Sequence, residues 1–428
     1  MSVPNMNNNK APLILWCSSH KTLAAEEIPL LLEAGFRVIP LMTDFWTFEY
    51  APSLDSQICD DWKKTIDLPS ETIQRLQAIR FYKNEGQNDF CEKELELLRE
   101  HVDIVYLSVL PNLAIRLAKV FPGTVLFRPF GHGSLNTYTR IAEHLKVDLD
   151  DLAGQSNYMW APILTTLQSP EDPRICANAH PLGAFVSKSR LGDVRWSPSE
   201  SEPYVVETIP RIEKQSYYKQ IFSQFVQDHG QLPLKILGGN SRRGGGLNDQ
   251  RIVGFLDDEE YYRVAARARL CIYHGRSHYH LHYHPIEFMA LGIPVLFHRD
   301  SALAAEGMQF GMSEAQLVDA GMFYHPEQAN EMARAAFANP YLAAGWSEGQ
   351  RYFMNEVFNR KKVLDQARWL KSRVLQHQNW LEHGSSLFAG PVSLSMTTRK
   401  RSIPHRVLRE VKRVIRRAKG KSVVPKVA

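Results

Sequence analysis

One stretch, from Leu270 to His298, constrains the fold of this chain more than any other. It begins with a short apolar run, continues as a polar loop rich in histidine, and ends in a second apolar run, Ile293 to Phe297. Between the loop and the second run, Pro285 suits the first turn of a helix and Gly292 suits its end. The order strand, loop, helix, strand predicts a βαβ unit with parallel strands. Ligands of such sheets bind beyond the carboxyl ends of the strands, where the loop and Glu287 fall.

The same alternation of strand-length apolar runs and helical runs opens each half of the chain. The first half begins with a strand from Leu13 to Trp16, and the second with a strand from Tyr204 to Ile209. A stretch rich in Pro and Ser, Arg195 to Pro203, lies between them and has the composition of a linker. Trp346 to Gln376 has the pattern of one long helix. The chain is therefore predicted to be an α/β protein with two Rossmann-like domains.

The run PIEFMALGIPV, from Pro285 to Val295, resembles the nucleotide-sugar motif of retaining GT-B glycosyltransferases, the glycogen-synthase and mannosyltransferase-like group 1 enzymes. The resemblance implies a GT-B fold with a cleft between the two domains. In that family a Glu, seven residues and a second Glu lead into the motif. Glu287 matches the second, which holds the donor ribose, whereas Tyr279 stands in place of the first. The domain limits that follow are 1–12 for a disordered lead-in, 13–195 for an acceptor domain, 196–345 for a nucleotide-sugar domain, 346–398 for helices returning to the first domain, and 399–428 for a basic tail.

The resemblance also assigns donor-binding residues in the second half. Arg211 and Lys214 resemble the Arg and Lys that neutralise the donor diphosphate. Two cations can form charge-assisted hydrogen bonds with two phosphates. The glycine-rich loop that contains Gly239 and Asn240 takes the place of the family's Gly-x-Gly segment. It is not a Walker loop, because no Gly-Lys-Ser/Thr follows.

Acceptor-side residues are expected in two loops of the first half. Ser19 and His20 follow the first predicted strand, and Arg128 and His132 lie in the loop RPFGHGS after a later strand. Loops at strand ends carry sites in this architecture. For Arg128, a buried Arg–carboxylate pair is an equally good alternative. His132 and Glu287 are the candidates for a catalytic role, and the general base stays open.

Four alternating histidines in the loop raise the question of a metal. In an extended segment all four would lie on one face, and imidazoles at that spacing can bind zinc or copper. The four residues are His278, His280, His282 and His284. No acidic or cysteine partner is near, and the family needs no bound metal, so neither a metal nor another cofactor is expected. His284-Pro285 and His180-Pro181 instead resemble the His-Pro feature of bacterial sialyl- and Kdo-transferases, which use CMP-sugars.

The charge is concentrated at the C-terminal end. The formal net charge is +5, yet residues 399–428 hold 12 of the 51 Lys and Arg and one of the 46 acids. Within this tail, Ile403 to Lys419 predicts a basic amphipathic helix suited to an anionic membrane surface. RNA binding or a solvated tail are the alternatives. Five scattered cysteines, without a Cys-x-x-Cys pair, favour a reducing compartment. Neither a signal peptide nor a transmembrane run is recognised.

Together these patterns predict a glycosyltransferase that moves a sugar, preferably a hexose, from a nucleotide-activated donor to a glycan or lipid-linked acceptor. An NDP-sugar is the favoured donor and cell-surface polysaccharide synthesis the favoured setting. The protein is expected in the cytoplasm, peripheral at the inner face of the membrane, without a nucleic-acid partner. The rival interpretations are a CMP-sugar transferase and a non-catalytic GT-B scaffold that binds sugars.

Overall fold

The structure is a computed structural model that describes residues 11–18, 20–42, 60–79, 91–108, 111–131, 137–213, 215–238, 249–254 and 256–383. The chain divides into two compact units, Met1–Leu381 and Glu382–Ala428, and the architecture below concerns the first. Within the described residues, no helix is long and apolar enough to cross a membrane. The predicted basic tail, 399–428, lies outside the described residues.

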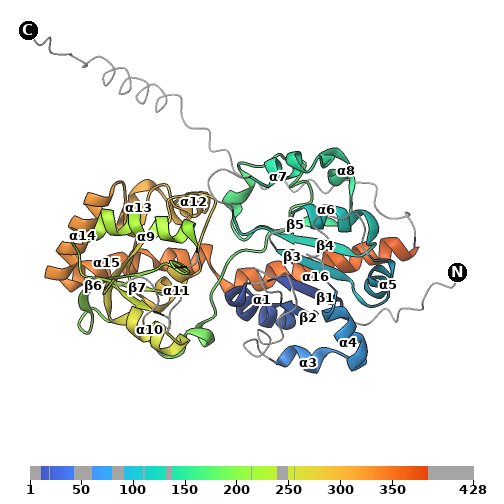
Figure 1. Ribbon diagram of the computed structural model, residues 1–428, viewed down its shortest axis with the longest axis horizontal. Helices are drawn as coiled ribbons and strands as arrows, with labels where there is room; N and C mark the ends of the chain where they lie inside the picture. Colours follow the sequence, from blue (N-terminus) through green and yellow to red (C-terminus); the bar gives the residue numbers. More distant parts are fainter. Residues whose placement is uncertain are drawn as a thin grey trace, which may run out of the picture. The chain divides into compact units, whose positions relative to one another are not determined.

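The first lobe is built on a five-stranded parallel sheet in the order β2-β1-β3-β4-β5. Its strands are β1 (Leu13–Ser18), β2 (Arg37–Met42), β3 (Ile104–Ser108), β4 (Thr124–Arg128) and β5 (Tyr158–Trp160). The helices between them are α1 (Lys21–Glu33), α3 (Asp61–Thr65), α4 (Ser70–Gln77), α5 (Glu92–His101), α6 (Pro111–Val120), α7 (Tyr138–His144) and α8 (Leu149–Gly154). All residues of β1, β3 and β4 are buried, as near-continuous apolar strands require in a sheet covered on both faces (Figure 1).

The second lobe is built on a six-stranded parallel sheet in the order β11-β10-β9-β6-β7-β8. Its strands are β6 (Glu202–Thr208), β7 (Leu234–Leu237), β8 (Ile252–Gly254), β9 (Ala268–Tyr273), β10 (Val295–His298) and β11 (Met322–Phe323). Its helices are α9 (Ser216–His229), α10 (Asp258–Arg267), α11 (His284–Leu291), α12 (Ala302–Gln309), α13 (Glu314–Asp319), α14 (Pro326–Ala338) and α15 (Pro340–Gly349). The predicted boundary at residue 195 falls between the two sheets.

The βαβ unit predicted from Leu270 to His298 is confirmed as β9, α11 and β10. Val295 to Phe297 of β10 pair in parallel with Cys271 to Tyr273 of β9. Pro285 lies in the first turn of α11, and Gly292 ends the helix with a left-handed φ of 84°. A residue with a Cβ would be strained at that φ, so glycine here fixes where the helix stops.

The chain returns to the first lobe through its last described helix. After α15 comes a short π-helix, η3 (Phe353–Val357), and then α16 (Arg360–His383). In Figure 1, α16 (orange) lies among the blue and teal elements of the first sheet. Arg360 pairs with Glu33 of α1, and the Gln366 side chain accepts a hydrogen bond from the Gly183 N–H at 3.0 Å. The prediction of one continuous helix from 346 to 376 is wrong, because the π-helix and a bend at Phe358 interrupt it.

Polar contacts join the two lobes near two short helical turns of the first lobe, η1 (Thr165–Gln168) and η2 (Lys188–Leu191). Glu306 of α12 accepts hydrogen bonds from the Thr165 hydroxyl at 2.9 Å and from the Thr166 N–H at 2.7 Å. Arg190 of η2 reaches α11, as described below. These contacts place the carboxyl edge of the second sheet next to loops of the first lobe.

Candidate functional site

The candidate site lies at the carboxyl ends of β6 and β9, which are neighbouring parallel strands. Val205 and Val206 pair with Leu270 and Cys271, so both strands end at the same edge of the sheet. Glu207 is the next residue of β6, and the histidine-rich loop follows β9 and leads into the N-terminus of α11. This is the edge at which open α/β sheets bind their ligands.

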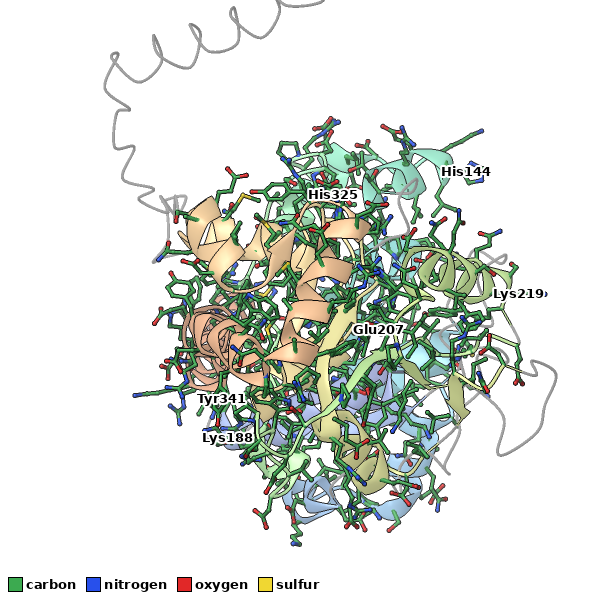
Figure 2. All side chains as sticks on the ribbon, turned by 90° about the vertical axis from the view of Figure 1, so that its left-hand side faces the viewer. His144, Lys188, Glu207, Lys219, His325 and Tyr341 are labelled. Carbon is green, nitrogen blue, oxygen red and sulfur yellow. The ribbon has the colours of Figure 1, made fainter. Side chains whose placement is uncertain are left out.

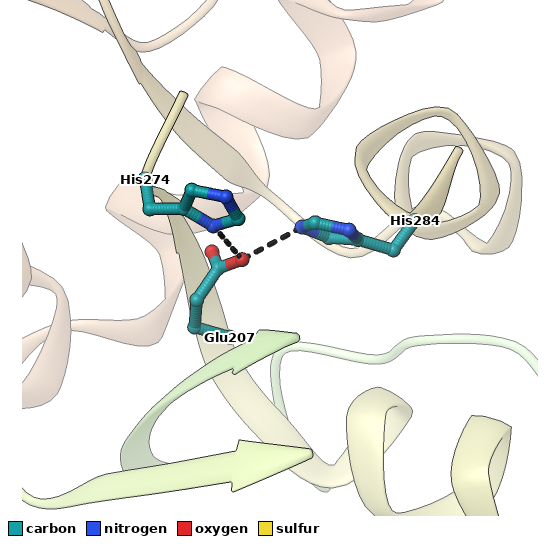
Figure 3. Close-up of side chains that lie close together, drawn as sticks. All are labelled: Glu207, His274 and His284. Carbon is teal, nitrogen blue, oxygen red and sulfur yellow. Dashed lines mark hydrogen bonds and ion pairs between the residues drawn. The ribbon is translucent and has the colours of Figure 1, made fainter. Parts of the chain in front are cut away.

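Glu207 is the centre of the site. Its carboxylate Oε1 lies 2.8 Å from His274 Nδ1 and 2.7 Å from His284 Nε2 (Figure 3). The Glu207 side chain is 0% exposed and those of His274 and His284 are 4% and 5% exposed. Tyr341, by comparison, is a surface residue that is 68% exposed, and Figure 2 labels both Glu207 and Tyr341. One buried carboxylate therefore fixes two imidazoles from different elements.

The carboxylate is ionised over the whole physiological range. Burial by itself raises the pKa of Glu207, but the charges and hydrogen bonds of His284 and His274 outweigh it and lower the pKa to about 2. Because the negative charge is buried, it needs these partners to be tolerated. The carboxylate and one nitrogen of each histidine all lie within 4.8 Å of one another, so these three residues could hold a metal ion.

Several ring nitrogens of the histidine-rich loop have no hydrogen-bond partner among the residues that the structure describes. They are buried, and they belong to three histidines of the loop: His274 Nε2, His280 Nδ1 and His282 Nε2. Burial lowers the pKa of His280 to about 4 and that of His282 well below its usual value, so both rings are neutral at pH 7. Buried polar atoms without a partner are uncommon in proteins and need an explanation.

The four alternating histidines do not share the face of an extended segment, because the loop forms a turn and then a single bridge from His280 to Gly131. Three of them still gather: the His280 and His282 rings are 4.6 Å apart, and the His282 and His284 rings 5.7 Å. His278 points elsewhere, toward Asp300 at 3.9 Å. The inference that no acidic partner is near was wrong, because Glu207 comes from a distant strand.

His20 faces this cluster from the first lobe. It caps the N-terminus of α1, where its Nδ1 accepts a hydrogen bond from the Leu23 N–H at 3.2 Å. Its ring stacks on Phe130 at 5.4 Å and lies 5.9 Å from the ring of Tyr283. Desolvation by the surrounding protein, helped by the charge of Arg211, lowers the pKa of His20 to about 4, although the residue is exposed at the surface of its own lobe. Because Nδ1 accepts, neutral His20 carries its proton on Nε2 and can donate it in a hydrogen bond.

Arg211 follows the end of β6 and has a left-handed backbone, with a φ of 56°. Such a conformation is costly for a residue with a side chain, and strain of this kind gathers at binding sites. Arg211 also influences His20 electrostatically, which places its charge near the histidine cluster. Other predicted site residues lie outside the described residues, namely Ser19, His132, Lys214, Gly239 and Asn240.

Glu287 is in the first turn of α11 and is only 5% exposed. It forms an ion pair with Arg190, which also binds Glu26 of α1 at 2.6 Å and the Tyr262 hydroxyl at 2.7 Å. Arg190 thus joins a carboxylate of each lobe. The predicted contact between Glu287 and a ribose would have to share this carboxylate with Arg190.

Arg128 makes the buried ion pair that the sequence left open as an alternative. Its guanidinium, 0% exposed, lies 2.5 Å from Glu27 and donates to the carbonyl of Ala161 at 3.1 Å and to that of Leu182. A contact between Arg128 and an acceptor would require this pair to break. The role predicted on the acceptor side therefore has no support from the position of the side chain.

Two further residues from the sequence take different positions. Tyr279 lies where the loops of the two lobes meet, and a Cβ at Gly131 would collide with its carbonyl oxygen. Glycine at 131 therefore allows the bridge to His280. His180 is buried, contacts the Gln366 carbonyl oxygen through Nε2 at 2.9 Å, and packs on Trp369 of α16. His180 thus contacts α16, whereas His284-Pro285 begins α11 at the carboxyl edge of the second sheet.

Glu207 and Arg190 are the residues that sequence reasoning missed. Glu207 interrupts an apolar strand, Tyr204 to Thr208, and a charge in a buried parallel strand is a signal worth following. Arg190 lies in a polar segment before the linker, where no local pattern distinguishes it.

Comparisons with solved structures agree with this arrangement. A glycosyltransferase from Rickettsia africae matches with a TM-score of 0.53 and 11% identity over 86% of this chain and 99% of its own. Alr3699/HepE from Anabaena, in complex with UDP, matches with a TM-score of 0.55 and 13% identity over 85% of this chain and 100% of its own. The same protein with UDP-glucose matches with a TM-score of 0.55 and 12% identity over 85% and 99%.

The chain has the GT-B fold of glycosyltransferases. The fold predicted from the resemblance of Pro285 to Val295 is thereby confirmed, although no family model and no curated protein matches the sequence. In this chain, the loop that leads into α11 lies close to the first lobe, because the rings of Tyr283 and His20 are 5.9 Å apart and His280 pairs with Gly131.

Proposed function

We propose that this GT-B protein transfers a sugar from a nucleotide-activated donor. The observation that carries the proposal is the set of charged and neutral groups at the carboxyl edge of the second sheet. The N-terminus of α11, the Arg211 side chain and the Nε2–H of His20 all offer positive charge or hydrogen-bond donors there. Donors that converge on one place, beside a helix N-terminus, suit the phosphates of a nucleotide sugar.

A diphosphate donor fits these groups best. Arg211 supplies a permanent charge, His20 a neutral donor, and the helix N-terminus a partial positive charge. HepE, which has the same fold, is described with UDP and with UDP-glucose, and this supports an NDP-hexose as the donor. Lys214 and the loop with Gly239 and Asn240 would add contacts to the diphosphate and the sugar, as the family resemblance implies.

The chemical step would take place between the two lobes. Neutral His20 would donate a hydrogen bond from Nε2 to the leaving phosphate or to the acceptor, which favours departure or orients the attacking hydroxyl. With Nδ1 engaged by the Leu23 N–H, His20 in this tautomer does not act as the base. Glu287 would contact the ribose, and Ser19 and His132 would line the acceptor side.

The acceptor and the setting form the finer part of the proposal. A glycan or lipid-linked acceptor in cell-surface polysaccharide synthesis fits a GT-B enzyme with a basic tail, residues 399–428. That tail would bring the protein to the inner face of the membrane by its attraction to anionic lipids.

A CMP-sugar donor is a second candidate, because His284 begins α11 and is followed by Pro285. A single phosphate at that helix N-terminus would be reached by His284. In this alternative, Arg211 would face the sugar carboxylate that such donors carry.

A thermal-shift panel with UDP, GDP, ADP and CMP tests the proposal. A nucleotide at 100 times its dissociation constant adds about 2.7 kcal/mol of stability. Stabilisation by UDP or GDP is expected, and stabilisation by CMP alone would select the second candidate. If none of the four stabilises the protein, the proposal fails and a non-catalytic scaffold becomes the better interpretation. Hydrolysis of the matching donor without acceptor then separates an enzyme from a protein that only binds.

A further inference from the structure

Three buried side chains at the carboxyl edge of the second sheet form a ready set of metal ligands. The ligand atoms of Glu207, His274 and His284 lie within 4.8 Å of one another and come from β6, the loop after β9 and α11. Their side chains are between 0% and 5% exposed. Imidazole nitrogen and carboxylate oxygen are ligands that Zn²⁺ prefers, with bonds of about 2.0–2.2 Å.

A further imidazole, His282, lies beside these ligands without being one of them. Its ring is 4.7 Å from that of His274 and 5.7 Å from that of His284. Its Nδ1 lies 3.3 Å from the Tyr273 hydroxyl, and the ligand atoms that lie within 4.8 Å of one another belong to Glu207, His274 and His284. His282 therefore lines the proposed site, and the three other residues supply its ligands.

The two ring nitrogens that could bind an ion with Glu207 face its carboxylate. His274 Nδ1 lies 2.8 Å from Oε1, and His284 Nε2 lies 2.7 Å from the same oxygen. Metal ligands are deprotonated when they bind, so an ion would replace the proton between each ring nitrogen and the carboxylate. The three groups are thus already directed at one point.

We propose that Glu207, His274 and His284 bind a divalent first-row transition ion of the Zn²⁺ class. The expectation of no metal rested on the lack of an acidic or cysteine partner and on the family resemblance. Glu207, 67 residues before His274 in the chain, removes the first of these grounds. The proposal does not depend on the proposed function, because the ion would bind with or without a donor. The chemistry also excludes Mg²⁺ and Ca²⁺, which prefer sites made of oxygen ligands.

Such an ion would hold three elements together at the edge of the sheet. With three protein ligands the ion would keep a fourth coordination position open. It would fix the end of β6, the histidine-rich loop and the first turn of α11 in one arrangement. The ion would then stabilise the conformation of the histidine-rich loop, which pairs with Gly131 of the first lobe.

Cobalt binding to the full-length protein, free of any affinity tag, tests the proposal. After treatment with a chelator, Co²⁺ is titrated while the visible absorption of tetrahedral cobalt is followed, and Zn²⁺ is then added as a competitor. One Co²⁺ per chain, displaced by Zn²⁺ with loss of the bands, is expected. Chelation is expected to lower the melting temperature and Zn²⁺ to restore it. A wild-type protein that shows no cobalt bands and no change in melting temperature overturns the proposal.

Matched variants locate the ion. Glu207→Gln and His274→Gln should each weaken Co²⁺ binding at least tenfold. His278→Gln is the control, because this histidine belongs to the same loop but is 41% exposed and faces Asp300. Equal cobalt affinity in all three variants would mean that the ion binds elsewhere and that Glu207 forms a hydrogen-bonded triad only. If a variant does not fold, the wild-type titration still decides the question. None of these measurements uses a nucleotide, so a failure here leaves the proposed function standing.

Discussion

Each lobe buries a carboxylate beneath the carboxyl edge of its sheet, but the two carboxylates are surrounded differently. In the first lobe, Glu27 pairs with Arg128 and accepts a hydrogen bond from the Tyr106 hydroxyl, and Arg128 satisfies backbone carbonyls with its remaining nitrogens. In the second lobe, Glu207 holds two histidines, and ring nitrogens of the same loop have no partner within the described part of the chain.

The difference separates a structural cluster from a candidate site. A buried polar network with every group satisfied makes one lobe rigid and offers nothing to a ligand. A network with unpaired ring nitrogens can still bind a ligand, but each unpaired buried nitrogen lowers the stability of the fold. Both clusters are buried and charged, so burial and charge alone would not distinguish them. The number of polar groups that have a hydrogen-bond partner does distinguish them.

The largest effect is expected from breaking the satisfied cluster. Glu27→Gln removes one partner of a fully buried ion pair and should lower the free energy of unfolding by about 3–5 kcal/mol. Urea denaturation measures the loss. Glu33→Ala is the control, because its pair with Arg360 is partly exposed and should contribute no more than about 1 kcal/mol. Similar losses in both variants would refute the distinction.

A smaller effect is expected at Glu287, which lies in the second lobe, where the candidate site is. Glu287→Ala should weaken nucleotide binding by about 1–3 kcal/mol if the carboxylate receives the ribose hydroxyls. Calorimetry with the nucleotide that stabilises the wild type measures this loss, and Glu259→Ala, at an exposed position of α10, is the control. Unchanged binding in a folded Glu287→Ala variant would leave this residue only its structural pair with Arg190.

The histidine cluster of the second lobe should also make the free energy of unfolding depend on pH below 6.5. Burial lowers the pKa of His280 from 6.5 to about 4, so between these pH values the unfolded chain takes up a proton that the folded protein does not. Stability is therefore complete above pH 6.5 and falls as the pH approaches 4, by up to about 1.4 kcal/mol per pH unit for one histidine. His280→Gln should flatten this slope, measured by denaturation at several pH values. The surface variant His144→Gln should leave the slope unchanged, and an unaltered slope in His280→Gln would contradict the assignment.

The smallest effect concerns backbone strain. Arg211 and Lys146 are the non-glycine residues of the described chain with positive φ, at 56° and 53°. Glycine at either position should stabilise the fold by about 1 kcal/mol through relief of the left-handed conformation. Arg211→Gly should also weaken UDP binding, whereas Lys146→Gly should not. Equal UDP affinity in both variants would show that the strain at Arg211 does not serve a ligand.

Local signals predicted the framework, whereas the partners within the site could not be predicted from them. Apolar runs, Pro285 and Gly292 act through their immediate neighbours, so the unit β9, α11 and β10 was predictable. Glu207 meets His274 across 67 residues of sequence, and Glu27 meets Arg128 across 101. Such pairs follow from how strands are ordered in a sheet, and the periodicity of a single sequence does not contain that order.

The return of α16 to the first lobe has a consequence for how the chain can be cut. The exposed segment around Gly192 and Asp193 is one covalent crossing between the lobes, and the segment between α15 and α16 is another. A protease that cleaves near Gly192 would produce a second fragment that still carries α16, whose Gln366 and Arg360 bind residues of the first fragment. The nicked protein should therefore migrate as one particle in native conditions and as two polypeptides only after denaturation.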